Sequence, residues 1–594
     1  MIDIESIKLP SLSFLKGKQH CYVRTYHNLW VPSKKNPDKK QAVKADVKNV
    51  GIIKDPAGIG VIEFYDDFIK SHPELMLDKI IVSRNFNQGQ TKPTLEIKAR
   101  VAEEQMPARK AETKGFGFHY LIKNLLKSDP LLSSIQETFP DRWDEIMAIA
   151  EFMVSELDAK MCDFDYFSRN HDTYCDHSLT PSSITKLLQS IDNDAILKFF
   201  FKYIDKLEKG AFYNKERFWA LDSTSFGSYS RNLSDAQWGR PKQEESLPQL
   251  NVMMLVDQDS GRPIYYQHFN GSIPDVSTVK TMCAKALQLG ARSFVLVFDR
   301  GYYGKDNLNE IFETGYHFVT CVPISKTVQF DPEIAEAAQQ FLRGKHFDPY
   351  CGQRCIRLTK QFDVGQGKTK TVYVHVFFDD EKAAAANTEL MNRREEVIKM
   401  KKSKAQLSPA NEHFASKYLI EKDDGSFEHN DEAYDDFIRR AGYWVIVSDV
   451  IKHTHVAYNA YKARGTVEEV FSTMKTRMKI NRMRVSTDSS LDGKCFIQFI
   501  AVSIWMLLEY VVDAKREKGE LKSGISMSDI IKELKSIKRI SFDNQCDVFT
   551  DASKMQKAIL GMFGLSMPSN GYKDGVPLAN KVMVAKKPHG YKRT

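Results

Sequence analysis

The order of the apolar runs between residues 217 and 322 constrains the fold more than any other feature of this sequence. Short runs bounded by turn residues alternate with helical periodicity in the order β-β-β-α-β-α-β. The expected strands are 218–221, 251–256, 263–269, 294–298 and 317–322, and the expected helices are 276–289 and 307–313. The first and fourth strands each end at a carboxylate, Asp222 and Asp299. This pattern predicts an α/β fold with both aspartates at one edge of the sheet, where such folds bind ligands.

A third acid lies further along the chain, in a segment of distinctive spacing. Tyr461, Arg464, Glu468 and Lys475 fall within a stripe about 60° wide at the roughly 100° per residue of an α-helix. A neighbouring apolar stripe consists of Val467, Val470, Phe471, Met474 and Met478. The segment predicts a helix over 456–478 that packs on the sheet and presents the four polar side chains together.

Each acid also has a purely structural explanation. Asp222 precedes a Ser-Thr-Ser run that is typical of a turn after a strand, and Asp299 is an ordinary charged end of a strand. Arg464 and Glu468 have the spacing of an intrahelical ion pair, worth a few tenths of a kcal/mol. Together, the three acids instead indicate a cation site. Mg²⁺ prefers oxygen ligands, and two such ions can assist phosphoryl transfer.

The net charge of +8 is mild for 594 residues, but basic residues cluster after Glu468. The cluster consists of Lys475, Arg477, Lys479, Arg482 and Arg484. No acid occurs between Glu469 and Asp488. Such a run can be a solvated helix face. Beside a carboxylate site it favours a polyanion, because Lys and Arg release counterions from phosphates.

Composition excludes several classes of protein. Hydrophobic residues make up 42% of the chain, which is typical of globular proteins and excludes a disordered or fibrous one. Nine scattered cysteines exclude a disulfide framework and favour a reducing cytoplasm. Acids near the N-terminus argue against a signal peptide. The apolar segment 495–512 contains Gln498, Ser503 and Glu509, so we expect a buried core helix and no membrane contact.

Composition and periodicity divide the chain into regions. We expect a strand-rich α+β region with a linker (1–115), a helical region that could bind DNA (116–210), a core in two parts (211–323 and 443–515), an insertion (324–442) and a helical C-terminal region (516–594). The lysine-rich segment 34–48 is expected to be either a solvated loop between strands or a phosphate-contacting arm. Two cysteine-containing motifs have weak zinc character: Cys351 with Cys355, and His171 with Cys175 and His177.

The spacing Tyr-x2-Arg-x3-Glu-x6-Lys from Tyr461 to Lys475 closely resembles the signature of DDE transposases of bacterial insertion sequences, in the insertion sequence 4 superfamily. Asp222-Ser-Thr and Asp299-Arg-Gly-Tyr-Tyr resemble the first and second aspartate motifs of that family. The segment Tyr22-Val-Arg-Thr-Tyr26 is similar to the insertion sequence 1634 branch. The resemblance covers about 217–510.

The resemblance implies a ribonuclease-H-like core, a mixed five-stranded sheet with helices, that carries a β-rich insertion. It implies a catalytic triad of Asp222, Asp299 and Glu468 that binds two Mg²⁺ ions, with Mn²⁺ as a substitute. Tyr461, Arg464 and Lys475 would contact transposon-end DNA, joined by the basic residues Lys479 and Arg482. Trp444 would stabilise a flipped base or, alternatively, pack as a strand aromatic in the core.

The implied activity is cut-and-paste transposition: cleavage at terminal inverted repeats and joining of the 3′-OH ends to target DNA. The expected partners are double-stranded DNA and a second copy of the chain, because two ends must be joined. The expected location is the bacterial cytoplasm, at the nucleoid. The alternatives are another ribonuclease-H-like nuclease such as a resolvase, a domesticated DNA-binding protein without catalysis, and an unrelated α/β protein whose acids are structural.

Overall fold

The computed structural model describes most of the chain, in two compact units, Met1–Ala111 and Glu112–Thr594. The described residues are 9–34, 36–72, 80–86, 92–99, 111–210, 217–239, 247–273, 275–292, 294–341, 345–365, 368–520, 524–542, 547–568, 572–573 and 576–577.

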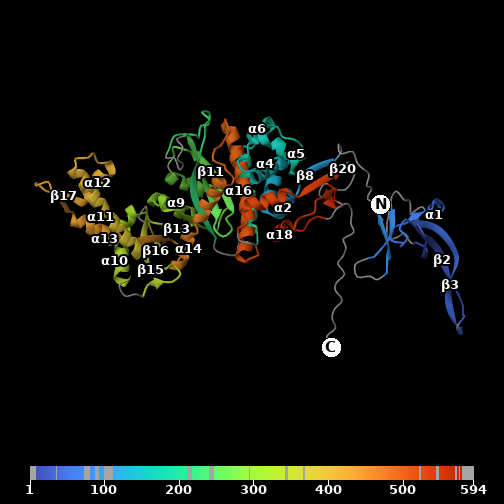
Figure 1. Ribbon diagram of the computed structural model, residues 1–594. Coiled ribbons are helices and arrows are strands. Elements are labelled where there is room, and N and C mark those ends of the chain that lie inside the picture. Colours follow the sequence, from blue (N-terminus) through green and yellow to red (C-terminus); the bar gives the residue numbers. More distant parts are fainter. Residues whose placement is uncertain are drawn as a thin grey trace. The chain divides into compact units, whose positions relative to one another are not determined.

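The first unit consists of strands and one short helix among its described residues (Figure 1). Its elements are β1 (Leu12–Lys16), β2 (Cys21–Ser33), β3 (Asn36–Ile53), β4 (Gly60–Val61), β5 (Glu63–Phe64), α1 (Asp66–Ser71), β6 (Ile80–Asn85) and β7 (Thr94–Ala99). They form two sheets, in the orders β1-β2-β3-β5 and β4-β6-β7. Alternate residues from both sheets, such as Val23 and Val82, fill a common core.

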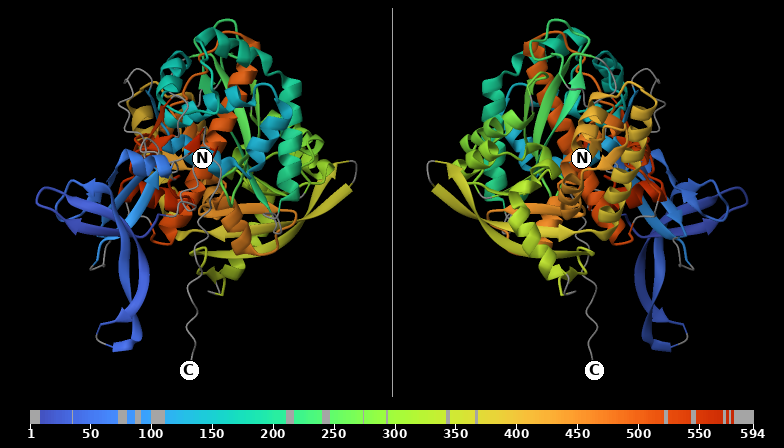
Figure 2. Two further views of the ribbon diagram at one scale, coloured as in Figure 1. Left: turned by 90° about the vertical axis from the view of Figure 1, so that its right-hand side faces the viewer. Right: turned by 90° about the vertical axis from the view of Figure 1, so that its left-hand side faces the viewer.

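The lysine-rich segment 34–48 is not the loop that we considered from the sequence. Strand β3 begins at Asn36 and pairs with β2 almost to its end, with Leu29 opposite Val43. The two strands form a long ribbon, whose far half is exposed and carries Trp30 with 62% of its surface accessible (Figure 2). Pairing with β2 along this segment outweighs its polar, lysine-rich composition.

After a short strand that ends at Gly115, the second unit continues with helices, as the periodicity predicts. They are α2 (Gly117–Leu126), α3 (Pro130–Thr138), α4 (Trp143–Ser155), α5 (Phe164–Asn170), α6 (Pro181–Ser190) and α7 (Asn193–Lys209). Side chains cap three of the N-termini: Asp129, Thr180 and Asp192 each accept a hydrogen bond from a backbone N–H of the first turn.

The central sheet has nine strands in the order β11-β10-β9-β12-β13-β19-β16-β15-β14. Its strands are β9 (Phe218–Gly227), β10 (Gln249–Asp257), β11 (Pro263–Asn270), β12 (Val295–Phe298), β13 (His317–Cys321), β14 (Phe347–Asp348), β15 (Gln353–Gly365), β16 (Lys368–Phe378) and β19 (Tyr443–Ser448). The helices α8 (Val279–Gln288) and α9 (Lys305–Thr314) connect β11, β12 and β13. The first five strands form a mixed sheet, with β9, β12 and β13 parallel and β10 antiparallel to both neighbours. This mixed α/β arrangement fits the expected ribonuclease-H-like core.

The five expected strands lie side by side, and β19 with strands of the insertion continues the sheet beyond β13 to nine strands. One expectation for the core needs correction. Strand β9 does not end at Asp222 but runs to Gly227. Its antiparallel partner β10 continues the hydrogen-bonded ladder from Trp219 to Gly227, which overrides the turn character of the Ser-Thr-Ser run.

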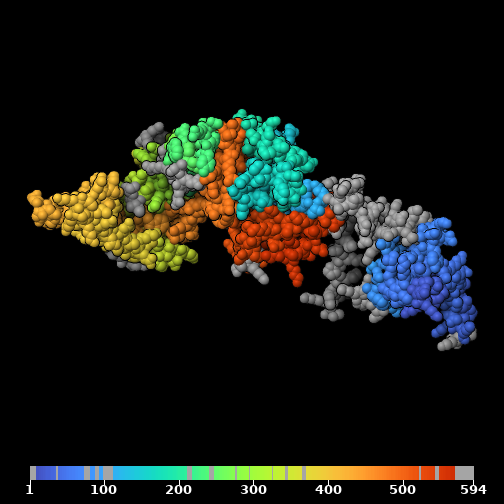
Figure 3. Space-filling model, turned by 45° about the horizontal axis from the view of Figure 1, so that its top comes forward, coloured from blue at the N-terminus to red at the C-terminus, as the bar shows by residue number. Residues whose placement is uncertain are grey.

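The insertion is only in part rich in strands. Besides β14, β15 and β16 it contains α10 (Asp331–Phe341), α11 (Asp380–Lys402), α12 (Pro409–Tyr418), α13 (Asp431–Arg440) and the short hairpin of β17 (Leu419–Glu421) and β18 (Phe427–His429). The helices α11, α12 and α13 form a lobe with its own small core around Leu390, Val397 and Phe414 (Figure 3, yellow). Strong helix formers in α11, capped by Asp379, account for its length.

The apolar segment 495–512 is a core helix, as we expected. Helix α16 (Asp488–Glu517) is long and apolar enough to span a membrane, but 83% of its most apolar window is buried inside the protein. It contacts α4 and α6 on one side and β11 on the other. The helix therefore joins the helical region to the sheet.

The C-terminal region is not purely helical in its described part. It holds α17 (Met527–Lys535) and α18 (Lys554–Met562), but also β20 (Lys538–Phe542) and β21 (Val548–Phe549). These two strands pair with each other, and β20 pairs with β8 (Ala111–Gly115). Two further short strands, β22 (Tyr572–Lys573) and β23 (Val576–Pro577), pair with each other.

An imidazole between two carboxylates ties α16 to the sheet and gives a pH-dependent stability. His268 of β11 contacts Asp235 through Nδ1 at 2.9 Å and Asp492 of α16 through Nε2 at 2.8 Å. Burial opposes the charge on the ring, but the two carboxylates outweigh it and raise the pKa of His268 to about 9. The folded protein therefore holds a proton that the unfolded chain releases above pH 6.5.

We expect this contribution to be complete below pH 6.5 and to disappear as the pH rises through 9, a loss of about 3 kcal/mol at most. Urea unfolding of wild type and His268→Gln at pH 6 and pH 9.5 measures it. The difference between the two proteins in free energy of unfolding should shrink at the higher pH. Parallel pH profiles would refute the assignment.

Candidate functional site

The register of two parallel strands places Asp222 and Asp299 side by side. Leu221 of β9 pairs with Phe298 of β12, so the next residue on each strand is an aspartate at the same level of the sheet. Asp299 keeps an extended backbone as it leaves β12, with φ −69° and ψ 157°. Since equivalent positions of parallel strands point to the same face, both carboxylates emerge together.

Asp222 is held by its own backbone and by a buried tyrosine. Its Oδ1 accepts hydrogen bonds from the Ser223 N–H at 2.7 Å and from the Tyr302 hydroxyl at 3.1 Å. The same hydroxyl lies 2.8 Å from the Ser223 Oγ. Sequence reasoning gave Tyr302 no role, although it belongs to the Asp299-Arg-Gly-Tyr-Tyr motif. The motif thus connects the two aspartates, because it begins at Asp299 and its tyrosine Tyr302 contacts Asp222.

Asp299 is bound by two of the residues predicted from the helical spacing. Its Oδ1 accepts hydrogen bonds from the Tyr461 hydroxyl at 3.1 Å and from Arg464 Nε at 3.2 Å. Arg464 Nη2 lies 3.1 Å from the same oxygen. The structure therefore brings Asp222, Asp299, Tyr461 and Arg464 to one edge of the sheet.

Glu468 joins this group through Arg464. Its Oε1 lies 3.4 Å from Arg464 Nη1, and its side chain is 59% exposed. Helix α15 (Gly465–Ser472), which carries Glu468, contacts β9 and β10. Arg464 thus contacts both Asp299 and Glu468. The intrahelical ion pair considered as an alternative does form, but it extends to an acid from the sheet.

The expected single helix over 456–478 is interrupted twice. Helix α14 (Thr454–Lys462) ends before Arg464, where tighter hydrogen bonds three residues apart replace the α-helical ones. A π-helical turn follows α15 at Thr473–Arg477 and adds a residue to that turn. Lys475 lies in this turn, and its Nζ lies 5.4 Å from the ring centre of Phe226 on β9.

The surroundings of Tyr461 and Arg464 determine their protonation states. Burial, together with the nearby Cys321 and Asp299, raises the pKa of Tyr461 above its usual range. Burial lowers the pKa of Arg464, but its contacts with Tyr461, Asp299 and Glu468 outweigh this and raise the pKa. The Tyr461 hydroxyl therefore remains a donor, and Arg464 remains charged, over the physiological pH range.

The three acids offer carboxylate oxygens, which are the ligands that hard divalent cations prefer. In the described part of the chain, the oxygens of these three carboxylates do not all lie within 4.8 Å of one another. The guanidinium of Arg464 supplies positive charge to Asp299 and Glu468 instead. The donor set suits Mg²⁺ or Mn²⁺ in chemistry, with Asp222 and Asp299 already adjacent.

Two of the predicted basic residues lie beside the far end of β9. Arg482 forms an isolated β-bridge with Gly227, and its guanidinium lies 4.6 Å from the ring centre of Tyr229. Lys475 and Arg482 therefore carry positive charge along the strand that bears Asp222. Lys479 is exposed and has a left-handed backbone, with φ 54°.

Trp444 is a strand aromatic that also lines a cavity. Its ring stacks on Phe377 with centres 4.3 Å apart, and its Nε1 donates a hydrogen bond to Gln353 at 3.0 Å. It borders the same cavity of about 830 Å³ as Asp299 and Tyr461. Trp444 is thus a strand aromatic packed on its neighbour, and its role at a flipped base stays a prediction.

The cavity lies between the sheet edge and the helices of the insertion. Its cationic lining residues are Arg300, Lys382, Lys417, Arg440, Lys462 and Arg464. Of its acids, Asp436 is paired with Arg440, and Asp299 is the candidate metal ligand. The insertion thus brings positive charge to the cavity that Asp299 borders.

A buried carboxylate fixes the chain that follows Glu468. Glu509 of α16 pairs with Arg477 of the π-helical turn and accepts a hydrogen bond from Trp505 Nε1 at 3.2 Å. On its exposed side, Arg477 lies 3.6 Å from Glu469. One arginine therefore has a buried and an exposed partner.

Comparison with known proteins gives one family match. Residues 213–504 match the family described as transposase DDE domain, and this match supports a DDE transposase. No curated protein matches the chain. A solved structure, the piggyBac transposase synaptic complex with hairpin DNA, aligns over 70% of this chain and 79% of its own, at 12% identity and a TM-score of 0.33. A TM-score this low does not establish a shared fold.

We expect Glu509→Gln to lower the free energy of unfolding by about 2 kcal/mol, because it weakens charge-assisted hydrogen bonds inside the protein. Glu469→Gln, which removes the exposed partner of the same arginine, should cost no more than about 0.5 kcal/mol. Urea unfolding monitored by tryptophan fluorescence compares the two variants. Equal losses would show that Glu509 does not anchor this turn.

Proposed function

We propose that this chain, whose residues 213–504 match the transposase DDE domain, is a cut-and-paste transposase of a bacterial insertion sequence in the insertion sequence 4 superfamily, with the insertion sequence 1634 branch as its subgroup. One observation carries the proposal. Asp222 and Asp299 lie side by side on paired strands, and Glu468 reaches them through Arg464 from a helix packed on the same sheet.

Asp222, Asp299 and Glu468 would hold two Mg²⁺ ions, for which Mn²⁺ can substitute. The ions would activate the attacking oxygen and stabilise the leaving one during phosphoryl transfer. Tyr302 and Tyr461 keep the aspartates oriented through their hydroxyl groups. Arg464 balances the negative charge of two of the acids and keeps the helix of Glu468 beside them.

DNA would lie along the positively charged side of the site. Lys475 and Arg482 follow β9 away from Asp222 and suit successive phosphates. The exposed Lys479 would contact a further phosphate. Beyond Asp299, Tyr461, Arg464 and Trp444 line the cavity, whose size and charge suit a strand end. Joining two element ends requires two active sites, so the DNA-bound form would be a homodimer. The enzyme would act on the nucleoid in the cytoplasm.

The first test is cleavage of DNA carrying the ends of the chain's own genomic element, with Mg²⁺ or Mn²⁺. Glu468→Gln should lower the cleavage rate by roughly 10³-fold, because a lost metal ligand removes several kcal/mol of transition-state stabilisation. Glu469→Gln is the matched control: it neutralises the adjacent exposed carboxylate and should cleave at a rate close to wild type.

Cuts at paired inverted repeats that vanish with Glu468→Gln would support the transposase. Cuts at branched DNA without such repeats would indicate a nuclease of another kind, such as a resolvase. Binding without any cleavage would indicate a domesticated DNA-binding protein. Equal cleavage by wild type and Glu468→Gln would remove Glu468 from the proposed triad.

The tyrosine that contacts Asp299 gives a finer test. Tyr461→Phe removes one hydrogen bond to this carboxylate, worth about 1 kcal/mol, and should slow cleavage about fivefold. Tyr458→Phe is the control, since its ring lies on the same helix but packs near Phe377 and Trp444. Single-turnover rates at saturating metal compare them. Identical rates for both variants would contradict a positioning role for Tyr461.

A further inference from the structure

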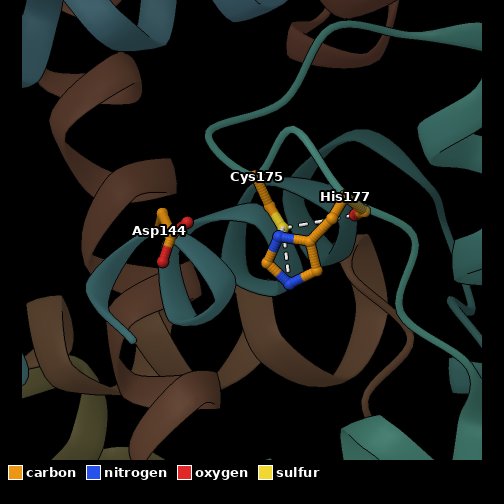
Figure 4. A group of neighbouring side chains, drawn as sticks. All are labelled: Asp144, Cys175 and His177. Carbon is orange, nitrogen blue, oxygen red and sulfur yellow. Dashed lines mark hydrogen bonds between the residues drawn. The ribbon is translucent and has the colours of Figure 1, made fainter. Parts of the chain in front are cut away.

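A group of metal-ligand side chains lies outside the proposed active site, in the helical region. Asp144 belongs to the first turn of α4, while Cys175 and His177 belong to the segment between α5 and α6 (Figure 4). One ligand atom from each lies within 4.8 Å of the others. The sequence suggested His171 in place of Asp144. The structure stacks His171 on Phe167 instead, with ring centres 4.6 Å apart.

Cys175 and His177 lie as close together as neighbouring ligands of one ion. The Cys175 Sγ lies 3.2 Å from Nδ1 and 3.5 Å from Nε2 of His177. Zinc–sulfur and zinc–nitrogen bonds of usual length, arranged tetrahedrally, place the two atoms about 3.6 Å apart. Because the sulfur is almost equally close to both ring nitrogens, the exposed imidazole must turn to direct Nδ1 at an ion that it shares with Cys175.

A second carboxylate lies where zinc sites often have an outer partner. Glu145 Oε1 is 3.1 Å from His177 Nε2, and its other oxygen accepts a hydrogen bond from Arg142 Nε at 2.8 Å. A histidine ligand usually donates its remaining N–H to such a carboxylate, which fixes the orientation of the ring. Nδ1, the nitrogen nearer to the sulfur, lies 3.4 Å from the exposed Asp176 Oδ1 and would give up this contact to bind the ion.

A reactive thiol is a poorer explanation of the same group. Nucleophilic cysteines have a lowered pKa. Burial instead raises the pKa of Cys175 to about 11. Without a cation this thiol stays protonated and inert.

We propose that Asp144, Cys175 and His177 bind one Zn²⁺ ion, with Glu145 orienting the histidine and solvent at the fourth position. Sulfur, imidazole and carboxylate together are a donor set of zinc. Asp144 is half-buried and His177 is exposed, so the ion can enter from solvent. The site goes beyond the proposed transposition chemistry and takes no part in it.

Zinc would act as a structural clip. It would fasten the segment of Cys175 and His177 to the start of α4, and α4 packs against the core helix α16. Because zinc would bind the folded chain only, its binding free energy would add to stability. Removing the ion should therefore lower the melting temperature without changing the sheet.

A second group, Asp348, Cys351 and Cys355, also has ligand atoms within 4.8 Å and must be separated from the first. The test therefore uses a background with Cys351→Ser and Cys355→Ser. Excess Mg²⁺ in every sample occupies carboxylate sites that prefer hard cations. Zinc that remains bound in this background then reports on the site of Cys175.

The full chain is stripped with a chelator, reloaded with Zn²⁺, freed of loose metal and analysed for zinc by atomic emission. The background should retain about one zinc per chain, and Zn²⁺ should raise its melting temperature. His177→Ala and Asp144→Asn should bind zinc at least about tenfold more weakly and lose the thermal shift. Cys162→Ser, which removes an exposed cysteine outside the group, should behave like the background.

Substitution of Co²⁺ gives a second readout, because cobalt bound to thiolate absorbs in the near ultraviolet. Cys175→Ser should abolish this band, and circular dichroism shows whether the variant is folded. If Cys175→Ser unfolds, the exposed His177→Ala decides the question. Absence of zinc from the reloaded background, or full retention in His177→Ala, would overturn the proposal.

Discussion

The parallel pairing of β9 with β12 is the constraint on which the candidate site depends. Four buried residues of β12, Val295–Phe298, pair with Phe218–Leu221, and the register of this apolar core places the next residues, Asp222 and Asp299, at one level. A slip of one residue would turn a whole strand to the opposite face of the sheet. Core packing therefore determines the spacing of the two carboxylates, and mutations far from the acids can disturb the site through the register alone.

Two adjacent carboxylates repel each other, so their surroundings must offset the charge. Tyr302 donates to Asp222, and Tyr461 and Arg464 donate to Asp299. Arg464 also contacts Glu468, which makes one guanidinium the electrostatic link between the sheet and the helix. This link lies at the bend between α14 and α15, where Arg464 and the start of α15 can turn toward the sheet. The interruption of the helix is thus part of how the third acid is positioned.

Much of this site can be predicted from the sequence, for identifiable reasons. The strand order and the core helix around 495–512 follow from the periodicity of apolar residues, which can be seen in the local sequence. The spacing from Tyr461 to Glu468 follows the periodicity of a helix in the same way. The length of β9 and the π-helical turn depend on partners remote in sequence, β10 and Glu509. Likewise, nothing near Cys175 in the sequence indicates Asp144, because only the packing of α4 brings the two together.

The topology of the insertion places charged residues beside the candidate site, although they are distant from it in the sequence. The insertion begins after β13 and ends before β19, and these two strands are antiparallel neighbours, with Cys321 opposite Ile446. Since β12 and β13 are parallel, the end of β13 lies at the same edge as Asp299. Both ends of the insertion are therefore anchored beside that carboxylate, and Lys382, Lys417 and Arg440 of its helices line the same cavity. An insertion at this point of the chain, whatever its length, must begin and end at the candidate site.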